Sequence, residues 1–166
     1  TGSFIDQMAS LLQTDAGGLN ELAKSHKIIY PIASRCGVFA KTDIQPLINE
    51  GAAKEDLAAS IFQAVVNQTI SGLACGKPIR GRVAFLGGPL HFLSELRERF
   101  IKTLKLTDKT ALIPKNSHLF AAFGSAVSAD KDTAESFSEI IGNIGKNNKL
   151  AVEIARLSPL FKDNNE

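Results

Sequence analysis

The sequence predicts an α/β fold with a small mixed sheet packed against helices, and two patterns support it. From residue 19 to residue 128, segments with apolar residues at helical spacing alternate with short apolar or β-branched segments, in the order helix, strand, helix, helix, strand, helix, strand, helix. The run over residues 83–86 is apolar throughout and ends in Gly87-Gly88. Such a run is typical of a strand covered on both faces, as in a parallel sheet.

The first half of the chain predicts helices around one extended segment. Apolar residues at helical spacing predict helices over 3–12, 19–25, 42–50 and 54–74. Ser3 is a good N-cap residue, so the first helix is expected to begin there. The segment 27–34 is apolar and β-branched, and Pro31 within it predicts an edge strand or a bent strand.

The second half predicts two strands, two helices and a helical tail. Strands are expected over 83–86 and 110–113, and helices over 89–104 and 118–128, the latter capped at Asn116-Ser117. After residue 129 the pattern predicts an amphipathic helix around 137–144, a second helix over 149–157 and a frayed end at 162–166. We therefore expect one domain over residues 1–128 and a helical extension over 129–166.

Composition excludes several classes of protein. Nineteen Lys and Arg against seventeen Asp and Glu give a net charge of +2, too small for a general nucleic-acid binder. No continuous apolar run approaches the length of a membrane span, and neither a membrane nor a nucleic acid is expected as a partner. Two cysteines in 166 residues are too few for a disulfide scaffold, which favours the cytoplasm. The chain has no phosphate-binding Walker loop, nucleophile elbow or zinc-protease motif.

Two glycine-containing segments are candidate ligand contacts. Gly87-Gly88 joins an apolar strand to a helix, where backbone could approach a ligand and free N–H groups could bind an anion, or where the glycines simply form a tight turn. Residues 121–126, around Gly124, are mostly small and could seat a flat ring or pack against another helix. The residues alone leave both alternatives open at each segment.

The cysteines offer a third candidate. Arg35 precedes Cys36, and a guanidinium would favour the metal-binding thiolate, although a lone cysteine is more often an inert apolar residue. Cys75, at the end of the long helix, fits that inert reading better. An iron–sulfur cluster usually takes four thiolates, which two cysteines per chain supply only if two chains share one cluster. His26, His91 and His118 show no metal-ligand spacing and are interpreted as ordinary surface or boundary residues.

Several segments together resemble a known family. They are residues 1–6, residues 34–44, the long helix after Gly51, residues 85–88 and residues 120–126, in family order over roughly residues 1–128. They are similar to the C-terminal half of the activator ATPases of 2-hydroxyacyl-CoA dehydratases, kin of the benzoyl-CoA reductase ATPase subunits. The resemblance implies the C-terminal lobe of the actin-like fold, shared by acetate kinase, sugar kinases, heat-shock chaperones and actin. Residues 87–100 look especially like very large fused activase proteins.

The resemblance also implies roles for single residues. Gly87 and Gly88 would belong to the adenosine motif, and Gly124 would line the adenine side. Cys36 would be one of two cysteines per subunit that hold a 4Fe–4S cluster across a two-fold dimer. The intact protein would use ATP or ADP with Mg²⁺ and deliver a low-potential electron to a dehydratase-like partner, with lobe closure as the coupling.

This sequence also departs from the family. The family's other cluster cysteine lies just before the Thr-Gly pair with which this chain begins, and its phosphate and Mg²⁺ motifs lie in the N-terminal lobe. Phe92 stands where the family commonly has an asparagine, so a ribose contact is not expected there. We expect a piece of a longer protein that by itself neither hydrolyses ATP nor holds a cluster. The alternatives are a degenerate activase repeat that serves for docking and, less favoured, a sugar or acid kinase lobe.

Overall fold

A computed structural model describes residues 2–34, 36–130 and 135–144. It divides into two compact units, Thr1–Ala126 and Val127–Glu166, which are described separately. Arg35, the helix expected over 149–157 and the chain end at 162–166 lie outside the described residues.

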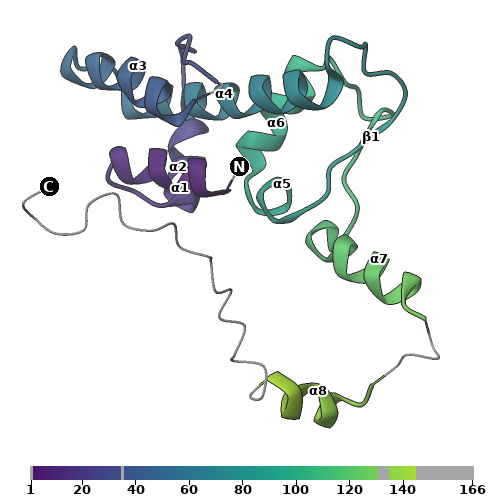
Figure 1. The fold of residues 1–166 in the computed structure, drawn as a ribbon. Coiled ribbons are helices and arrows are strands. Elements are labelled where there is room, and N and C mark those ends of the chain that lie inside the picture. The colour runs from purple at the N-terminus through teal and green to yellow at the C-terminus, as the bar shows by residue number, and fades with distance from the viewer. Residues whose placement is uncertain (1, 35, 131–134, 145–166) are drawn as a thin grey trace, which may run out of the picture. The chain divides into compact units, whose positions relative to one another are not determined.

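The first unit contains the helices and the sheet, and Figure 1 labels most of them along the chain. Its elements are α1 (Gly2–Leu11), α2 (Ala16–Ala23), α3 (Gly37–Asn49), α4 (Lys54–Ala74), β1 (Val83–Ala84), α5 (Gly88–Phe92), α6 (Ser94–Thr103), β2 (Ala111–Leu112), the 3₁₀ helix η1 (Ser117–Leu119) and α7 (Phe120–Ser128), whose last residues fall in the second unit. The second unit contains α8 (Phe137–Ile144), at the position expected for an amphipathic helix.

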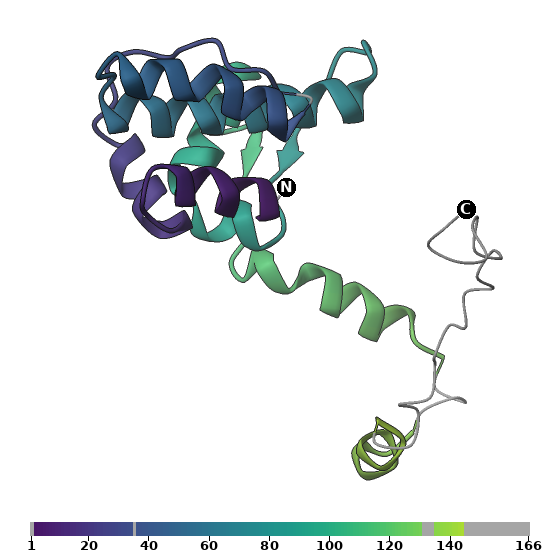
Figure 2. The same cartoon turned by 60° about the vertical axis from the view of Figure 1, so that its left-hand side comes forward.

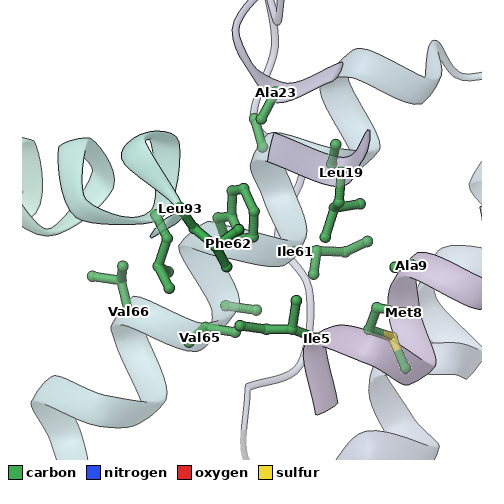
Figure 3. Packing of buried hydrophobic residues seen from close by; sticks show 14 of the residues in the cluster. Ile5, Met8, Ala9, Leu19, Ala23, Ile61, Phe62, Val65, Val66 and Leu93 are labelled. Atoms are coloured by element: carbon green, nitrogen blue, oxygen red, sulfur yellow. The ribbon is translucent and has the colours of Figure 1, made fainter. Parts of the chain in front are cut away.

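The core of the first unit is built around α4. Ile61 and Phe62 are fully buried, and Figure 3 shows them facing Ile5 of α1 and Leu19 of α2. α4 also packs against α6. Its apolar face is the face that the helical spacing predicts, so the sequence pattern and the packing agree.

α4 is also long and apolar enough, by length and composition, to cross a membrane, and half of its most apolar stretch is buried inside the structure. Every residue from Asp56 to Phe62 is buried. Burial in the core of the first unit accounts for the composition of that half of the helix.

The small sheet is a parallel pair, and Figure 2 shows its two short strands. Val83 pairs with Ala111 and Ala84 with Leu112. Val83 N–H donates to the Thr110 carbonyl at 2.8 Å. These strands and the helices confirm the predicted α/β class; within the described residues the sheet shows parallel pairing alone.

The segment 27–34 is extended but is not a strand, which corrects the prediction. Its backbone N–H groups bond to side chains of helices instead of to a neighbouring strand. Asp56 Oδ1 accepts from Lys27 N–H at 2.6 Å and from Ile28 N–H at 2.9 Å, and Ser60 Oγ accepts from Tyr30 N–H at 2.8 Å. Residues of α4 therefore satisfy the donors that a β ladder would have used.

Several helix boundaries differ from the predicted ones; α2 (Ala16–Ala23) begins earlier than expected, and α7 (Phe120–Ser128) begins later, after a 3₁₀ turn. α1 begins at Gly2, so Ser3 lies inside it, and α3 begins at Gly37, earlier than expected. The helix predicted over 89–104 is divided at Leu93, which is extended and buried. The buried side chain of Asn20 in α2 accepts from Glu95 N–H at 2.9 Å and donates to Ser94 Oγ at 3.2 Å, so α2 supplies the cap that starts α6.

Truncating the α4 core should destabilise the chain strongly. We expect Phe62→Ala to lower the free energy of unfolding by about 3–5 kcal/mol and Ile61→Val by about 0.5–1.5 kcal/mol, because both side chains are fully buried. Leu73→Ala, on the same helix but 82% exposed, should stay within about 0.5 kcal/mol. Urea unfolding followed by circular dichroism measures all three. Equal losses for Phe62→Ala and Leu73→Ala would contradict this core.

Replacing the Asp56 carboxylate should remove an acid-dependent part of the stability. The backbone N–H groups of Ile28 and Lys27 hold the pKa of Asp56 below its ordinary value of 3.8. Because the folded-state pKa is lowered, this stabilisation is fully present above pH 3.8 and is lost as the pH falls through the folded-state value.

We therefore expect Asp56→Asn to be less stable than the wild type at neutral pH, with a gap that narrows in acid. Urea unfolding between about pH 3 and 7 measures the gap. Asp108→Asn, at an exposed position, is the control and should follow the wild type at every pH. A gap for Asp56→Asn that does not change with pH would contradict the assignment.

Candidate functional site

The turn at Gly87 and Gly88 lies between β1 and α5. Gly87 has a φ of +94°, which side-chain-bearing residues rarely adopt, so this position requires glycine. Its N–H donates to the Ser117 carbonyl at 3.0 Å, and its carbonyl accepts from His91 N–H at 3.0 Å. A Cβ placed on Gly88 would meet no atom within 4 Å. The turn therefore presents open backbone that a ligand could approach closely.

The start of α5 offers little for binding an anion, although the open backbone of the glycine turn lets a ligand approach closely. α5 has five residues, too few to develop a strong dipole, and Pro89 in its first turn has no N–H to donate. The geometry favours contact with an uncharged part of a ligand at this turn.

An aromatic cluster that the sequence analysis missed lies beside this turn. The His91 ring lies 4.2 Å from the His118 ring and 4.7 Å from the Phe92 ring, and Phe92 lies 5.3 Å from His118, all between centroids. His91 Nδ1 and the buried Ser117 Oγ form a hydrogen bond of 2.9 Å. We call His91, Phe92 and His118 the ring cluster.

A signal for the ring cluster was present in the sequence. β1 and β2 are parallel, so their carboxyl ends meet at the same edge of the sheet, where α/β proteins bind ligands. His91 and His118 each follow one of these strands. Taking the histidines as isolated surface residues overlooked this convergence.

Gly124 lies in α7 and also has open space where a Cβ would stand. Within the described part of α7 no residue is buried, and Phe120 and Phe123 are 41% and 56% exposed. The hydrogen bond from Gly87 to Ser117 ties the glycine turn to η1, which leads directly into α7. Gly124 is thus joined to Gly87 through the chain, and its role as an adenine contact stays a prediction.

A small apolar cavity of about 150 Å³ lies beside the turn, lined by Val65, Thr69, Leu86, Pro89, Leu90, Leu96 and Phe100. Sites that enclose drug-sized ligands have volumes of about 300–1,000 Å³. This cavity is too small to enclose a nucleotide. A larger hollow of about 520 Å³ lies at the turn between α1 and α2, and its lining includes none of the predicted site residues.

Cys36 is the N-cap residue of α3 and is partly exposed. The backbone N–H groups of Phe39 and then Val38 hold the pKa of the Cys36 thiol below its ordinary value, because they favour the thiolate at the start of a helix. The expected cause was Arg35, which lies outside the described residues. The first turn of α3 therefore supplies an independent reason for thiolate character at Cys36.

The start of α1 lies against the start of α3. A Cβ placed on Gly37 would stand 3.7 Å from Cδ2 of Phe4, which is ordinary contact. The first turn of α1 and the first turn of α3 therefore lie next to each other. This juxtaposition joins two segments that the resemblance links to one cluster.

Cys75 has a different setting. It ends α4 in the left-handed conformation, is exposed, and its thiol donates to the Gly72 carbonyl at 3.2 Å. Among the described residues, no group of three or more His, Cys, Asp or Glu side chains could hold a metal ion. Cys36 on one chain would thus need thiolates from elsewhere to bind a cluster.

Comparison with known proteins gives several relatives that are named as activators of 2-hydroxyacyl-CoA dehydratases. No family model matches the chain. The 2-hydroxyisocaproyl-CoA dehydratase activator of Clostridioides difficile is 28% identical over 142 residues, which are 84% of this chain and 51% of that protein. The (R)-2-hydroxyglutaryl-CoA dehydratase activating ATPase of Acidaminococcus fermentans is 38% identical over 89 residues, 53% of this chain and 34% of that protein. The chain spans about half the length, or less, of these relatives.

Two solved structures share the fold. Component A of the Acidaminococcus fermentans (R)-2-hydroxyglutaryl-CoA dehydratase matches with a TM-score of 0.69 and 28% identity, over 81% of this chain and 50% of that one. The Clostridium difficile activator of 2-hydroxyisocaproyl-CoA dehydratase, with bound ADPNP, matches with a TM-score of 0.66 and 23% identity, over 96% of this chain and 52% of that one.

The pH dependence of alkylation should report the setting of Cys36. In a Cys75→Ser variant, we expect Cys36 to react with iodoacetamide at a lower pH when the chain is folded than when it is unfolded in urea, because unfolding removes the N–H groups of Phe39 and Val38 from the sulfur. Mass spectrometry of quenched samples gives the rate at each pH. Identical pH profiles in the two states would contradict the assigned effect of the helix start.

Proposed function

We propose that this chain, a relative of the 2-hydroxyacyl-CoA dehydratase activators in sequence and in fold, is one lobe of such an ATP-dependent activator. The proposal rests on the agreement of the sequence comparison with the structure comparison. Two relatives are named as activators of these dehydratases, and component A of a 2-hydroxyglutaryl-CoA dehydratase has the same fold with a TM-score of 0.69. In the intact protein the lobe would contribute to ATP binding and to a cytoplasmic electron transfer to a dehydratase-like partner.

The nucleotide contacts are assigned to the glycine turn. Gly87 and Gly88 present open backbone at the carboxyl edge of the parallel strands, where α/β proteins bind ligands. Gly124 is assigned to the adenine side. A related activator was solved with bound ADPNP, which supports a nucleotide as the ligand. Phosphate and Mg²⁺ contacts are assigned to the other lobe.

The iron–sulfur role is assigned to Cys36. Its lowered pKa and partial exposure suit a thiolate ligand, and the contact between Phe4 and Gly37 would bring residues upstream of α1 toward it. Val38 and Phe39 beside it are 70% and 64% exposed, which suits burial by a second subunit or repeat across a two-fold axis. A bound 4Fe–4S cluster would supply one-electron transfer at low potential.

Hydrogen bonds within this chain hold both proposed contact regions, the segment that leads to Cys36 and the glycine turn, in place. α4 fixes the segment leading to Cys36, and the hydrogen bond from Gly87 to Ser117 fixes the glycine turn. With the remaining thiolates and the phosphate contacts assigned elsewhere, the 166-residue chain alone should release no phosphate from ATP. Phosphate release that depends on ATP and is lost in a variant of this chain would refute the one-lobe proposal.

A second candidate function is a degenerate activase repeat that docks a partner. Phe92 favours it, because this phenyl ring is 68% exposed and cannot form the polar contact expected of an asparagine at its position. In this case the glycine turn would keep its shape but bind no nucleotide.

Substitution at Gly88 should separate the two candidates. In a longer protein that carries both lobes, we expect Gly88→Ala to weaken ATP binding at least about tenfold, because the new methyl group occupies the open space at the turn. The unfolding midpoint should not change, since a Cβ there meets no atom within 4 Å. Isothermal titration calorimetry measures the affinity.

Gly72→Ala is the matched control. A Cβ at Gly72 also meets no atom within 4 Å, and the residue lies on α4 away from the turn. It should leave ATP affinity unaltered. Absence of ATP binding in the unsubstituted two-lobe protein would favour the docking candidate instead.

A further inference from the structure

The ring cluster forms an aromatic surface immediately after the glycine turn. Phe92 is 68% exposed, whereas His91 and His118 are partly buried beneath it. The three rings contact one another with centroid distances of 4.2–5.3 Å. Their positions, on α5 and η1, place them at the edge of the sheet where Gly87 and Gly88 present open backbone.

Hydrogen bonds hold the cluster in place from below. Ser117 accepts from Gly87 N–H through its carbonyl and bonds to His91 through its hydroxyl. His118 Nδ1 is buried without a hydrogen-bond partner in the described structure. The ring contacts and the bonds through Ser117 together fix the positions of the three rings relative to one another.

The shape of this surface suits a flat ring. The adjoining cavity, at about 150 Å³, is too small to enclose a nucleotide, which favours a ligand that lies on the surface beside the turn. A planar heteroaromatic ring gains stacking energy on aromatic side chains whatever its exact substituents.

The same surface presents few groups that could form hydrogen bonds with the hydroxyls of a sugar. Phe92 has no hydrogen-bonding atom, Gly87 and Gly88 have no side chains, and the Ser117 hydroxyl is buried and bonded to His91. Asn116, exposed at the start of η1, is the amide that could contact a sugar hydroxyl.

We propose that the ring cluster stacks the base of the nucleotide and that this lobe binds adenine nucleosides without distinguishing ribose from deoxyribose. The inference rests on the nucleotide role proposed for Gly87 and Gly88 and names the specificity of that site. Phe92 is then the specificity-determining residue, since its exposed ring offers a stacking surface and no hydrogen-bonding group.

Nuclear magnetic resonance of the 166-residue chain tests the proposal directly. The chain has three histidines. The imidazole signals of His91 and His118 report on the ring cluster, and the signal of His26, which bonds to Ala23 and Arg99 instead, is the internal control. Adenosine, 2′-deoxyadenosine and ribose 5-phosphate are titrated separately. We expect the two nucleosides to shift the His91 and His118 signals with equal affinity, and ribose 5-phosphate to shift neither.

Two variants identify the stacking residue. Phe92→Leu keeps an apolar side chain without a ring and should weaken adenosine binding about tenfold. Phe137→Leu, at a 76% exposed position on α8, is the matched control and should bind as the wild type does. Equal weakening in both variants would overturn the assignment to Phe92.

The remaining outcomes separate this inference from the proposed function. Tighter binding of adenosine than of 2′-deoxyadenosine, abolished by Asn116→Ala, would overturn sugar-independent binding and leave the nucleotide role standing. If neither nucleoside shifts any histidine signal, the stacking surface is overturned. The ATP titration of the two-lobe protein and its Gly88→Ala variant would then decide the nucleotide role by itself.

Discussion

The Asp56 carboxylate, buried on α4, holds the segment that leads from α2 to Cys36. It accepts two backbone N–H groups, from Lys27 and Ile28, and Ser60 one turn further along α4 accepts a third from Tyr30. These three bonds use backbone N–H groups that a β ladder would need, and they hold residues 27–34 along α4 instead of in a sheet. The position of the first turn of α3, and with it Cys36, depends on this arrangement.

Polar side chains also join the helices of the first unit to one another. Asn20 of α2 caps α6, and Arg99 of α6 bonds to His26 Nε2 while His26 Nδ1 bonds to the Ala23 carbonyl. α2 and α6 both pack on α4. Cys36 and the glycine turn are therefore carried by one framework, each at the start of a helix that this framework positions.

Local sequence patterns could predict the helices and the small sheet, because helical spacing and continuous apolar runs are set by neighbouring residues. They could not predict what depends on distant side chains. The segment 27–34 has the composition of a strand, but Asp56 and Ser60 satisfy its backbone. The break at Leu93 likewise depends on Asn20, far away in the sequence. At the candidate site, Gly87 and Gly88 were recognisable from their place after a strand, whereas the ring cluster required knowing that two strands are parallel neighbours.

The role proposed for Cys36 is that of a ligand to a cluster shared between two copies of an activator. Anaerobic reconstitution with iron and sulfide of a protein extended upstream of Thr1 tests it, with iron content and visible absorbance as readouts. We predict about two irons per chain, as one 4Fe–4S cluster between two chains requires, lost in Cys36→Ser and retained in Cys75→Ser. The same cluster absorbance in wild type and Cys36→Ser would show that Cys36 is not a cluster ligand.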